Sequence, residues 1–210
     1  MEGREGLKTG TTTLGIVCKD GVVIAADKRA TAGHFIAGKD MDKVVQINES
    51  VALTIAGSVS DAQVFIKLLR AELKLKNVKT NRNSTIKEAA NLAARMSYEG
   101  VRQYFPSMAH YLLAGFDKEG VHLYEIYPDG SLMEVKDFIS SGSGSPMVFG
   151  ILEQTYKDTI TTKEAEDAAV KAISAAMQRD SASGNGIDVM TITKNSIKKT
   201  VQKKMQVTSI

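Results

Sequence analysis

Three consecutive threonines near the start of the chain, residues 11–13, are the residues best suited to nucleophilic chemistry. A threonine hydroxyl is a weak nucleophile, so it needs a base within hydrogen-bond reach. The α-amine of an N-terminal residue is such a base, because its pKa of about 7.7 to 8.0 leaves a useful fraction neutral. In this chain the amine of Thr11 is held in a peptide bond to Gly10. We therefore expect residues 1–10 to be a leader that is removed by cleavage between Gly10 and Thr11.

Gly10 suits the position before a bond that is to be cut. A residue without a Cβ lets two chain segments approach closely, and it tolerates strained backbone angles. The alternative is that this threonine-rich, apolar stretch is simply the beginning of an edge strand, because β-branched residues favour strands. The two interpretations differ in what else the chain must supply around Thr11.

An N-terminal nucleophile needs a cation that favours the alkoxide, a carboxylate that holds the cation, and backbone N–H groups that receive an oxyanion. Asp27, at the end of an expected strand, and Lys43, at the start of another, are the candidate carboxylate and cation. Gly57 lies at an expected strand-to-helix junction, where N–H groups are unpaired, so it is the candidate oxyanion donor. The alternatives are a surface salt bridge for the charged pair and an ordinary turn for the glycine.

Two segments rich in glycine and serine offer further polar groups. Residues 140–146 read Ser-Ser-Gly-Ser-Gly-Ser-Pro, and residues 178–186 read Gln-Arg-Asp-Ser-Ala-Ser-Gly-Asn-Gly. The first can cradle a polar group, and the second offers the Asp180 carboxylate and the Ser183 hydroxyl. Segments of both kinds also occur as ordinary turns and helix caps.

The composition indicates one soluble-type domain. The chain has 210 residues, of which 43% are apolar and 24% charged, and this is enough for one sizeable core. A net charge of +3 with dispersed basic residues argues against nucleic acid as a partner, and we expect the Lys-rich tail to be a solvated helix face or a frayed end. The leader has no apolar segment, and no stretch approaches the ~18 apolar residues of a membrane span. We expect no membrane association and a cytoplasmic location.

Cysteine and histidine usage argues against metal and histidine-based chemistry. Cys18 is a single cysteine in an apolar run, so it forms no internal disulfide and is expected to be a buried thiol. The histidines at 34, 110 and 122 show neither metal-ligand nor triad-like spacing. We therefore expect no metal and no organic cofactor.

Hydrophobic periodicity predicts strands, two helices, strands, two helices and a final strand. Asp20-Gly21 is a hairpin signal between the first two strands. The expected strands cover residues 13–18, 22–26, 44–47, 51–56, 111–116, 121–127, a strand ending at 135, and 187–193. Helices are expected from residue 60, from residue 85 to Pro106, from about 146 to 156, and from 162 to 178. Three of them begin at capping-box pairs: Ser60 with Gln63, Thr85 with Glu88, and Thr161 with Glu164.

This order of elements predicts the fold class. Helices that come in pairs between antiparallel strand groups argue against a doubly wound parallel sheet. The natural packing is an α+β fold, a four-layer αββα sandwich of two antiparallel sheets between helix pairs. We expect residues 11–210 to form this single domain.

Taken together, the segments resemble the β subunit of archaeal-type 20S proteasomes, a family of N-terminal nucleophile hydrolases. The resemblance runs from Thr11 to about Thr193, and the joint pattern is specific although no single piece is. It rests on residues 10–13, residues 25–29, Lys43, residues 56–57 followed by 61–63, residues 142–146 and residues 179–184. It favours the nucleophile over the edge strand at Thr11.

The resemblance implies a role for each matching residue. Thr11 matches the family's nucleophile, and Gly57 matches the oxyanion donor. Asp27 and Lys43 match the charged pair beneath the threonine. The polar set that supports the amine and its proton transfers matches Ser143, Asp180 and Ser183.

The resemblance also implies a substrate site. Thr31 and Val59 match positions whose main chain pairs with an extended peptide. The pocket for the side chain before the scissile bond matches five apolar residues: Ala30, Met41, Val45, Ile55 and Val59. A threonine endopeptidase that degrades unfolded proteins, with a chymotrypsin-like preference for large apolar residues, is therefore implied.

The implied partners are identical β subunits and proteasome α subunits in stacked seven-membered rings, an ATP-dependent unfoldase regulator, and polypeptide substrates. Three alternatives stay open. A bacterial two-ring relative is shorter and lacks the segment at 179–184. A small-molecule amidase of the same fold would share the nucleophile, and a non-catalytic ring subunit would normally lack Thr11 or Lys43.

Overall fold

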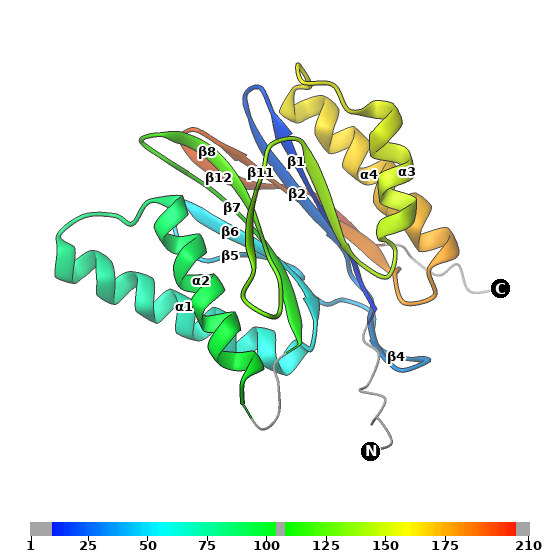
Figure 1. Cartoon of the computed structure of the whole chain (residues 1–210). Coiled ribbons are helices and arrows are strands. Elements are labelled where there is room, and N and C mark those ends of the chain that lie inside the picture. Colours follow the sequence, from blue (N-terminus) through cyan, green and yellow to red (C-terminus); the bar gives the residue numbers. More distant parts are fainter. Residues whose placement is uncertain (1–9, 104–107, 205–210) are drawn as a thin grey trace.

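Two antiparallel sheets of five strands each lie at the centre of the chain (Figure 1). The computed structural model describes residues 10–103 and 108–204. The first sheet has the order β10 (Phe138–Gly142), β1 (Thr12–Cys18), β2 (Gly21–Asp27), β11 (Gly186–Thr193) and β12 (Ser196–Lys204). The second has the order β5 (Val44–Gln46), β6 (Val51–Gly57), β7 (Ala109–Asp117), β8 (Gly120–Ile126) and β9 (Leu132–Val135). A small separate hairpin is formed by β3 (Ala30–Ala32) and β4 (Phe35–Gly38).

Each sheet is covered on its outer face by a pair of helices (Figure 1). The helices α1 (Val59–Thr80) and α2 (Ile86–Val101) lie on the second sheet. The helices α3 (Ser145–Thr155) and α4 (Thr162–Arg179) lie on the first. The layers therefore run helix pair, sheet, sheet, helix pair, which confirms the predicted α+β sandwich.

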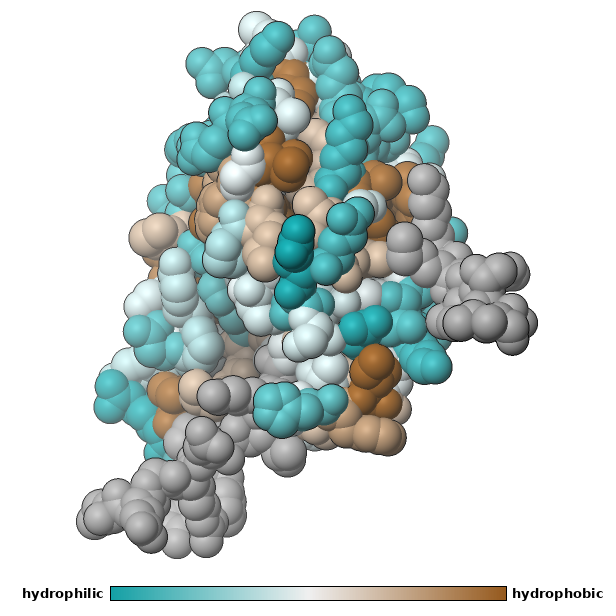
Figure 2. Space-filling view, turned by 90° about the vertical axis from the view of Figure 1, so that its right-hand side faces the viewer, coloured by the Kyte–Doolittle hydropathy of each residue, from teal (hydrophilic) through white to brown (hydrophobic). Residues whose placement is uncertain are grey.

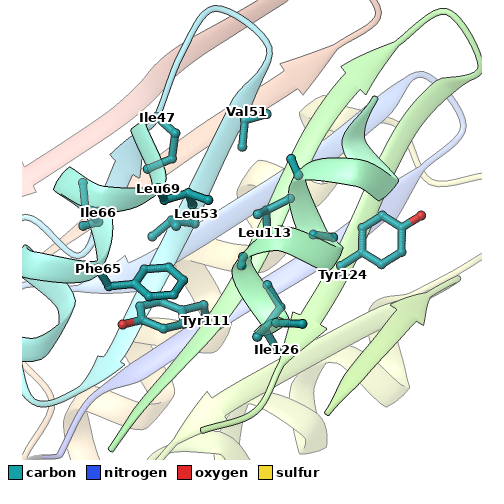
Figure 3. Packing of buried hydrophobic residues seen from close by; sticks show 14 of the residues in the cluster. Ile47, Val51, Leu53, Phe65, Ile66, Leu69, Tyr111, Leu113, Tyr124 and Ile126 are labelled. Carbon is teal, nitrogen blue, oxygen red and sulfur yellow. The ribbon is translucent and has the colours of Figure 1, made fainter. Parts of the chain in front are cut away.

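Three clusters of buried apolar side chains correspond to the three spaces between these layers. One lies between α1, α2 and the second sheet, where Phe65 stacks on Tyr111 with ring centroids 4.1 Å apart (Figure 3). Another fills the space between the first sheet and α3 and α4, and includes Leu14 and Ile173. The third lies between the two sheets. Burial on both faces explains why β1 and β2 are nearly continuous apolar runs.

The hairpin of β1 and β2 begins the domain as predicted. Cys18 pairs with Gly21, so Lys19 and Asp20 form a two-residue turn. The Asp20 carboxylate accepts hydrogen bonds from the N–H and the hydroxyl of Thr162, at 2.8 and 3.0 Å. The turn thereby holds the first residue of α4.

Two of the three predicted capping boxes are confirmed, and one is wrong. The pairs Thr85 with Glu88 and Thr161 with Glu164 cap α2 and α4. The first helix is instead capped by Ser58, whose side chain accepts from the N–H of Asp61, so the helix begins at Val59. The Ser60 hydroxyl donates instead toward the Asp61 side chain or pairs with Ser58.

The remaining differences concern short or charged segments. The prediction that the Lys-rich tail is a helix face or frayed end is wrong, because residues 196–204 form β12 on the edge of the first sheet. The serine-rich segment begins inside a strand that sequence analysis missed, β10, which pairs with β1. Helix α2 ends at Val101, and the predicted stop at Pro106 lies outside the described residues.

Figure 2 shows the side of the molecule that carries α3 and α4, where hydrophilic residues predominate and hydrophobic ones are interspersed. Within the described part of the chain, no helix combines the length and the apolar character that crossing a bilayer requires.

Candidate active site

Thr11 stands immediately before β1 and is 5% exposed. Its position is fixed by strand pairing, because Thr12 lies opposite Gly142 at the end of β10. Ser143 follows at once, and its hydroxyl oxygen lies 3.3 Å from the Thr11 nitrogen, from which it accepts a hydrogen bond. The nitrogen that would become an α-amine is therefore already held by a hydroxyl group.

The Asp27 carboxylate lies beside Thr11, at the end of β2, and is fully buried. Its Oδ1 accepts from the Lys43 ammonium at 2.7 Å and from the N–H of Thr12 at 3.0 Å. Its Oδ2 accepts from the N–H groups of Arg29 and Gly184, both at 2.9 Å. Four donors fix the position of this buried carboxylate, so the alternative of a surface salt bridge is wrong.

Lys43 is 4% exposed, and this burial has a chemical consequence. Burial lowers the pKa of Lys43, because it disfavours the charged ammonium, while the Asp27 carboxylate acts in the opposite direction. The net pKa lies below the ordinary value for lysine. The side chain can therefore release and take up a proton more readily than an exposed lysine.

A directed chain of hydroxyl groups converges on Asp180. Ser143 and Ser183 donate to its Oδ2 at 2.7 and 2.6 Å. Because the single Ser183 proton is used in this bond, the contact of 2.6 Å between Ser183 Oγ and Thr12 Oγ1 has Thr12 as its donor. These hydrogen bonds bring together Ser143, Asp180 and Ser183, as predicted, and they also include Thr12.

A cavity of about 380 Å³ opens beside Thr11. Lys43 and Gly57 line it together with Thr11. All six predicted substrate-binding residues also line it: Ala30, Thr31, Met41, Val45, Ile55 and Val59. Sequence analysis missed four polar or charged lining residues, Asp42, Gln63, Lys67 and Arg70. Three of these lie on α1 at positions 63, 67 and 70, a helical spacing that places them on one face.

Gly57 is the last residue of β6 and has φ of 120°. A Cβ at this position would overlap the carbonyl oxygen of Met108, and side chains rarely adopt this φ. Only glycine therefore fits where β6 turns into α1. The two interpretations of Gly57 are compatible, since it is both a turn residue and a residue of the cavity wall.

Gly10 is held against the cavity by its neighbours. Its N–H donates to the hydroxyl of Thr31 at 3.1 Å. The expected contact of Thr31 with a substrate is made by its main chain, whereas its contact with Gly10 is made by its side chain. A Cβ on Gly10 would overlap the Ala182 side chain, which agrees with the expected close approach.

Arg29 is a further residue that supports the site. Its Nε donates to the Asn185 side chain at 2.8 Å, and its guanidinium donates to the Ser181 carbonyl at 2.7 Å. It thereby ties the end of β2 to the segment that carries Ser183. Arg29 belongs to the motif at 25–29, but its type and position alone gave no sign of the partner.

Neither Cys18 nor a metal cluster contributes to the site. Burial raises the pKa of Cys18 to about 12, so its thiol is a weak nucleophile at neutral pH. No group of three or more His, Cys, Asp or Glu side chains within residues 10–103 and 108–204 is arranged to hold a metal ion.

The αββα sandwich, with a threonine directly before an inner strand and a buried Asp–Lys pair bonded to the following residue, defines the class of N-terminal nucleophile hydrolases. A family model described as "Proteasome subunit" matches residues 7–192. The curated relatives include "Proteasome subunit beta" of Ferroglobus placidus, 46% identical over 88% of this chain and 87% of that protein. The proteins of the same name from Methanosarcina mazei and Methanothermobacter thermautotrophicus are each 45% identical, over 90% and 92% of this chain and 90% of either relative. This chain therefore belongs to the proteasome subunit family, and it is a β-type subunit and a threonine-type peptidase.

Proposed function

We propose that the chain is the precursor of a catalytic β subunit of a 20S proteasome, with Thr11 as its nucleophile. The single observation that carries the proposal is that Thr11, Lys43 and Gly57 line one cavity, while Asp27 holds the lysine at 2.7 Å. A non-catalytic ring subunit would have no use for a buried lysine with a lowered pKa beside an N-terminal threonine.

Cleavage between Gly10 and Thr11 activates the site in this proposal. The Ser143 hydroxyl already accepts from the Thr11 nitrogen, so removal of residues 1–10 leaves the new amine in a prepared position. The contact between Gly10 and Thr31 supports the idea that the leader's last residue occupies the place of a substrate residue before its scissile bond. The leader residues 1–9 lie outside the described part of the chain.

The reaction is acyl transfer. The neutral Thr11 amine or Lys43 takes the proton from the Thr11 hydroxyl, and the oxygen attacks a peptide carbonyl. The N–H of Gly57 receives the oxyanion, the protonated leaving amine departs, and an ester joins the substrate to Thr11. Water then hydrolyses the ester and restores the hydroxyl. Apart from this water, residues of the chain supply the nucleophile, the base and the oxyanion donor.

Intact mass spectrometry of the purified particle tests the activation step. Wild-type protein should lack residues 1–10, and Thr11→Ala should retain them and lose peptide hydrolysis. Thr11→Ser is the matched control, since it keeps a hydroxyl and should still process. Uncut wild-type chain with full peptidase activity would disprove the proposal.

We further propose a preference for large apolar side chains before the cleaved bond. The supporting observation is that Ala30, Met41, Val45, Ile55 and Val59 line the same cavity as Thr11. Fluorogenic peptides with Leu, Arg or Glu before the bond test it, and they also test whether Lys67 and Arg70, which line the cavity too, attract acidic residues. Val45→Lys should shift cleavage toward acidic residues, whereas Val45→Leu should not. An unchanged preference in Val45→Lys would show that this pocket is misassigned.

We propose assembly into stacked rings of seven with α subunits, served in the cytoplasm by an ATP-dependent unfoldase. An exposed apolar stripe on α1 supports an interface, with Val64, Leu68, Leu75 and Val78 between 47% and 73% exposed. The mass of the native particle separates this proposal from a free small-molecule amidase, which would act as an unassembled chain.

A further inference from the structure

A second buried lysine lies beside the catalytic pair. Lys28, next to Asp27 in the chain, is 1% exposed, and its ammonium contacts three carboxylates. It lies 2.9 Å from Asp40, 3.4 Å from Asp42 and 3.1 Å from Asp188. None of these contacts takes part in the proposed chemistry. Breaking a buried ion pair is costly, so the Lys28 ammonium holds the segments that carry these three carboxylates in place.

The C-terminal strand supplies a second cation to the same group. Lys199 of β12 lies 3.2 Å from Asp42 Oδ1 and 3.0 Å from Asp188 Oδ2, the same two oxygens that Lys28 contacts. Two ammonium groups and two carboxylates therefore alternate in one cluster. Burial acts to raise the pKa of Asp42, but Lys199 and Lys28 outweigh it, so the pKa lies below its usual range.

The strand register explains how Lys199 reaches this cluster. Met190 pairs with Lys199 and Val189 with Val201, so Thr200 is an extra residue in β12, a β-bulge. Lys199 lies on the face of the strand opposite to Lys198, because side chains alternate along a strand. Asp188, which is fully buried in β11, is thus the fixed member to which the C-terminal strand is joined.

The cluster also includes the segment of residues 39–43, which lies between β4 and β5 and has no regular secondary structure. It contributes Met41, Asp42 and Lys43 to the wall of the cavity beside Thr11. Its main chain is joined to its surroundings through the N–H of Met41, which donates to the Lys28 carbonyl at 3.0 Å, and through the Lys43 carbonyl, which accepts from Ile55 at 2.9 Å. The ion pairs of Asp40 and Asp42 are therefore a large part of what holds the segment.

We propose that Lys28, Asp188 and Lys199 form a clamp that positions residues 39–43, and that Lys199 is a positioning residue by which the C-terminal strand sets the geometry of Lys43. The inference rests on the proposed function of Thr11 and Lys43. Without Lys199, Asp42 and Asp188 share the Lys28 ammonium. Their mutual repulsion then displaces Asp42, which is 67% exposed, rather than Asp188, which is fixed in the sheet.

The test compares Lys199→Met with Lys198→Met in the assembled particle. Both variants remove one lysine from β12, but Lys198 lies on the other face of the strand. Lys199→Met should lower kcat for peptide hydrolysis about tenfold with a smaller change in KM, because Val45 and Ile55 stay fixed in strands. Lys199→Arg, which keeps the charge, should restore kcat, and Lys198→Met should behave as wild type.

Two further measurements secure the result. Hydrogen exchange of peptides covering residues 39–43 should be faster in Lys199→Met than in Lys198→Met. Without the ion pair between Lys199 and Asp42, the hydrogen bond from the Met41 N–H to the Lys28 carbonyl should open more often. Asp42→Asn removes the carboxylate that pairs with Lys199, and it should also lower kcat. If neither variant changes kcat or exchange, the clamp is disproved. If wild type hydrolyses no peptide, the proposed function fails, while the exchange comparison still decides on the clamp.

Discussion

Lys43 shows how one buried side chain ties stability to chemistry. It is almost completely enclosed, and its ammonium forms an ion pair with Asp27. An uncompensated charge in this position would be strongly unfavourable. The paired lysine instead keeps a lowered pKa, which is the property that a proton-transferring group requires.

The lowered pKa of Lys43 predicts a specific pH dependence of stability. Between that lowered value and the unfolded value of about 10.4, the unfolded chain binds more protons than the folded chain, so the free energy of unfolding rises with pH. Lys43→Met removes this contribution. The stability of wild type relative to the variant should therefore rise through this window, as measured by thermal unfolding of both chains in matched buffers. A difference that stays flat would contradict the lowered pKa, and Lys198→Met is the exposed control.

The Thr12 hydroxyl is predicted to contribute to stability as well as to the site. It is fully buried and donates to Ser183 at 2.6 Å. Thr12→Val keeps the shape but removes this bond, and should lower the free energy of unfolding by about 1 kcal/mol. Thr12→Ser should retain most of it. Thermal unfolding decides, and equal midpoints for wild type and Thr12→Val would mean that the bond contributes nothing.

For single residues, the sequence predicted which side chains belong to the site better than it predicted which residues they contact. The pairing of Asp27 with Lys43 was expected, and they do meet. The role of Arg29 was missed, because its partners lie more than 150 positions away and nothing local signals them. Ser143 was found only through the ordered motifs of a family, since the pairing of β10 with β1 brings it to Thr11 across 132 positions.

Among the elements, α1 gives the clearest test of how helix starts are predicted. Ser60 and Gln63 have capping-box spacing, yet Ser58 makes the cap. The cause is the position of Gly57, whose positive φ ends β6 and leaves Ser58 extended, with φ of −63° and ψ of 122°. The backbone at the junction therefore decides the cap, and the spacing of side chains does not.

Alanine substitutions distinguish the two serines. Ser58→Ala should destabilise the chain by about 0.5 to 1 kcal/mol, toward the low end for a lost cap because its bond to Asp61 is 3.5 Å long. Ser60→Ala, one residue inside the helix, should cost less or stabilise slightly, because alanine has the higher helix propensity. Thermal unfolding of the two variants side by side is the measurement. The reverse order would restore Ser60 as the cap.

The missed strands lack the long apolar alternation by which a strand is recognised in a sequence. The hairpin of β3 and β4 is short and largely exposed, so it lacks a long apolar alternation. Strand β12 is rich in lysine, which suits an edge strand that must not pair further, but it also hides the strand signal. The long helices and the central strands were predicted well, because their periodicity comes from burial on a defined face.

For the whole molecule, the layers followed from the order of elements, but the surface proposed to meet a partner did not. The stripe on α1 is apolar and exposed, and its members fall at positions 64, 68, 75 and 78. In the sequence these residues are as apolar as those of the buried face of the same helix. Only the packing of α1 on the second sheet shows which face remains uncovered.

A charge introduced on that stripe should affect assembly before it affects folding. Val78→Glu, at a residue that is 73% exposed, should reduce the yield of full particles in native mass spectrometry while the thermal midpoint of the free chain changes little. Lys87→Glu changes the charge of an exposed residue on α2, away from the stripe, and is the control. Normal assembly of Val78→Glu would remove this face from the proposed interface.

The convergence of two serine hydroxyls on one oxygen of Asp180 determines how a freed amine at position 11 is held. The Ser143 proton points to Asp180 Oδ2 at 2.7 Å, with the Thr11 carbonyl at 3.4 Å as its other acceptor, so toward the Thr11 nitrogen Ser143 acts as the acceptor. The electron pair of the neutral amine is thus left unengaged by this neighbour. It remains available for the threonine's own hydroxyl proton, which is the first transfer that hydrolysis requires.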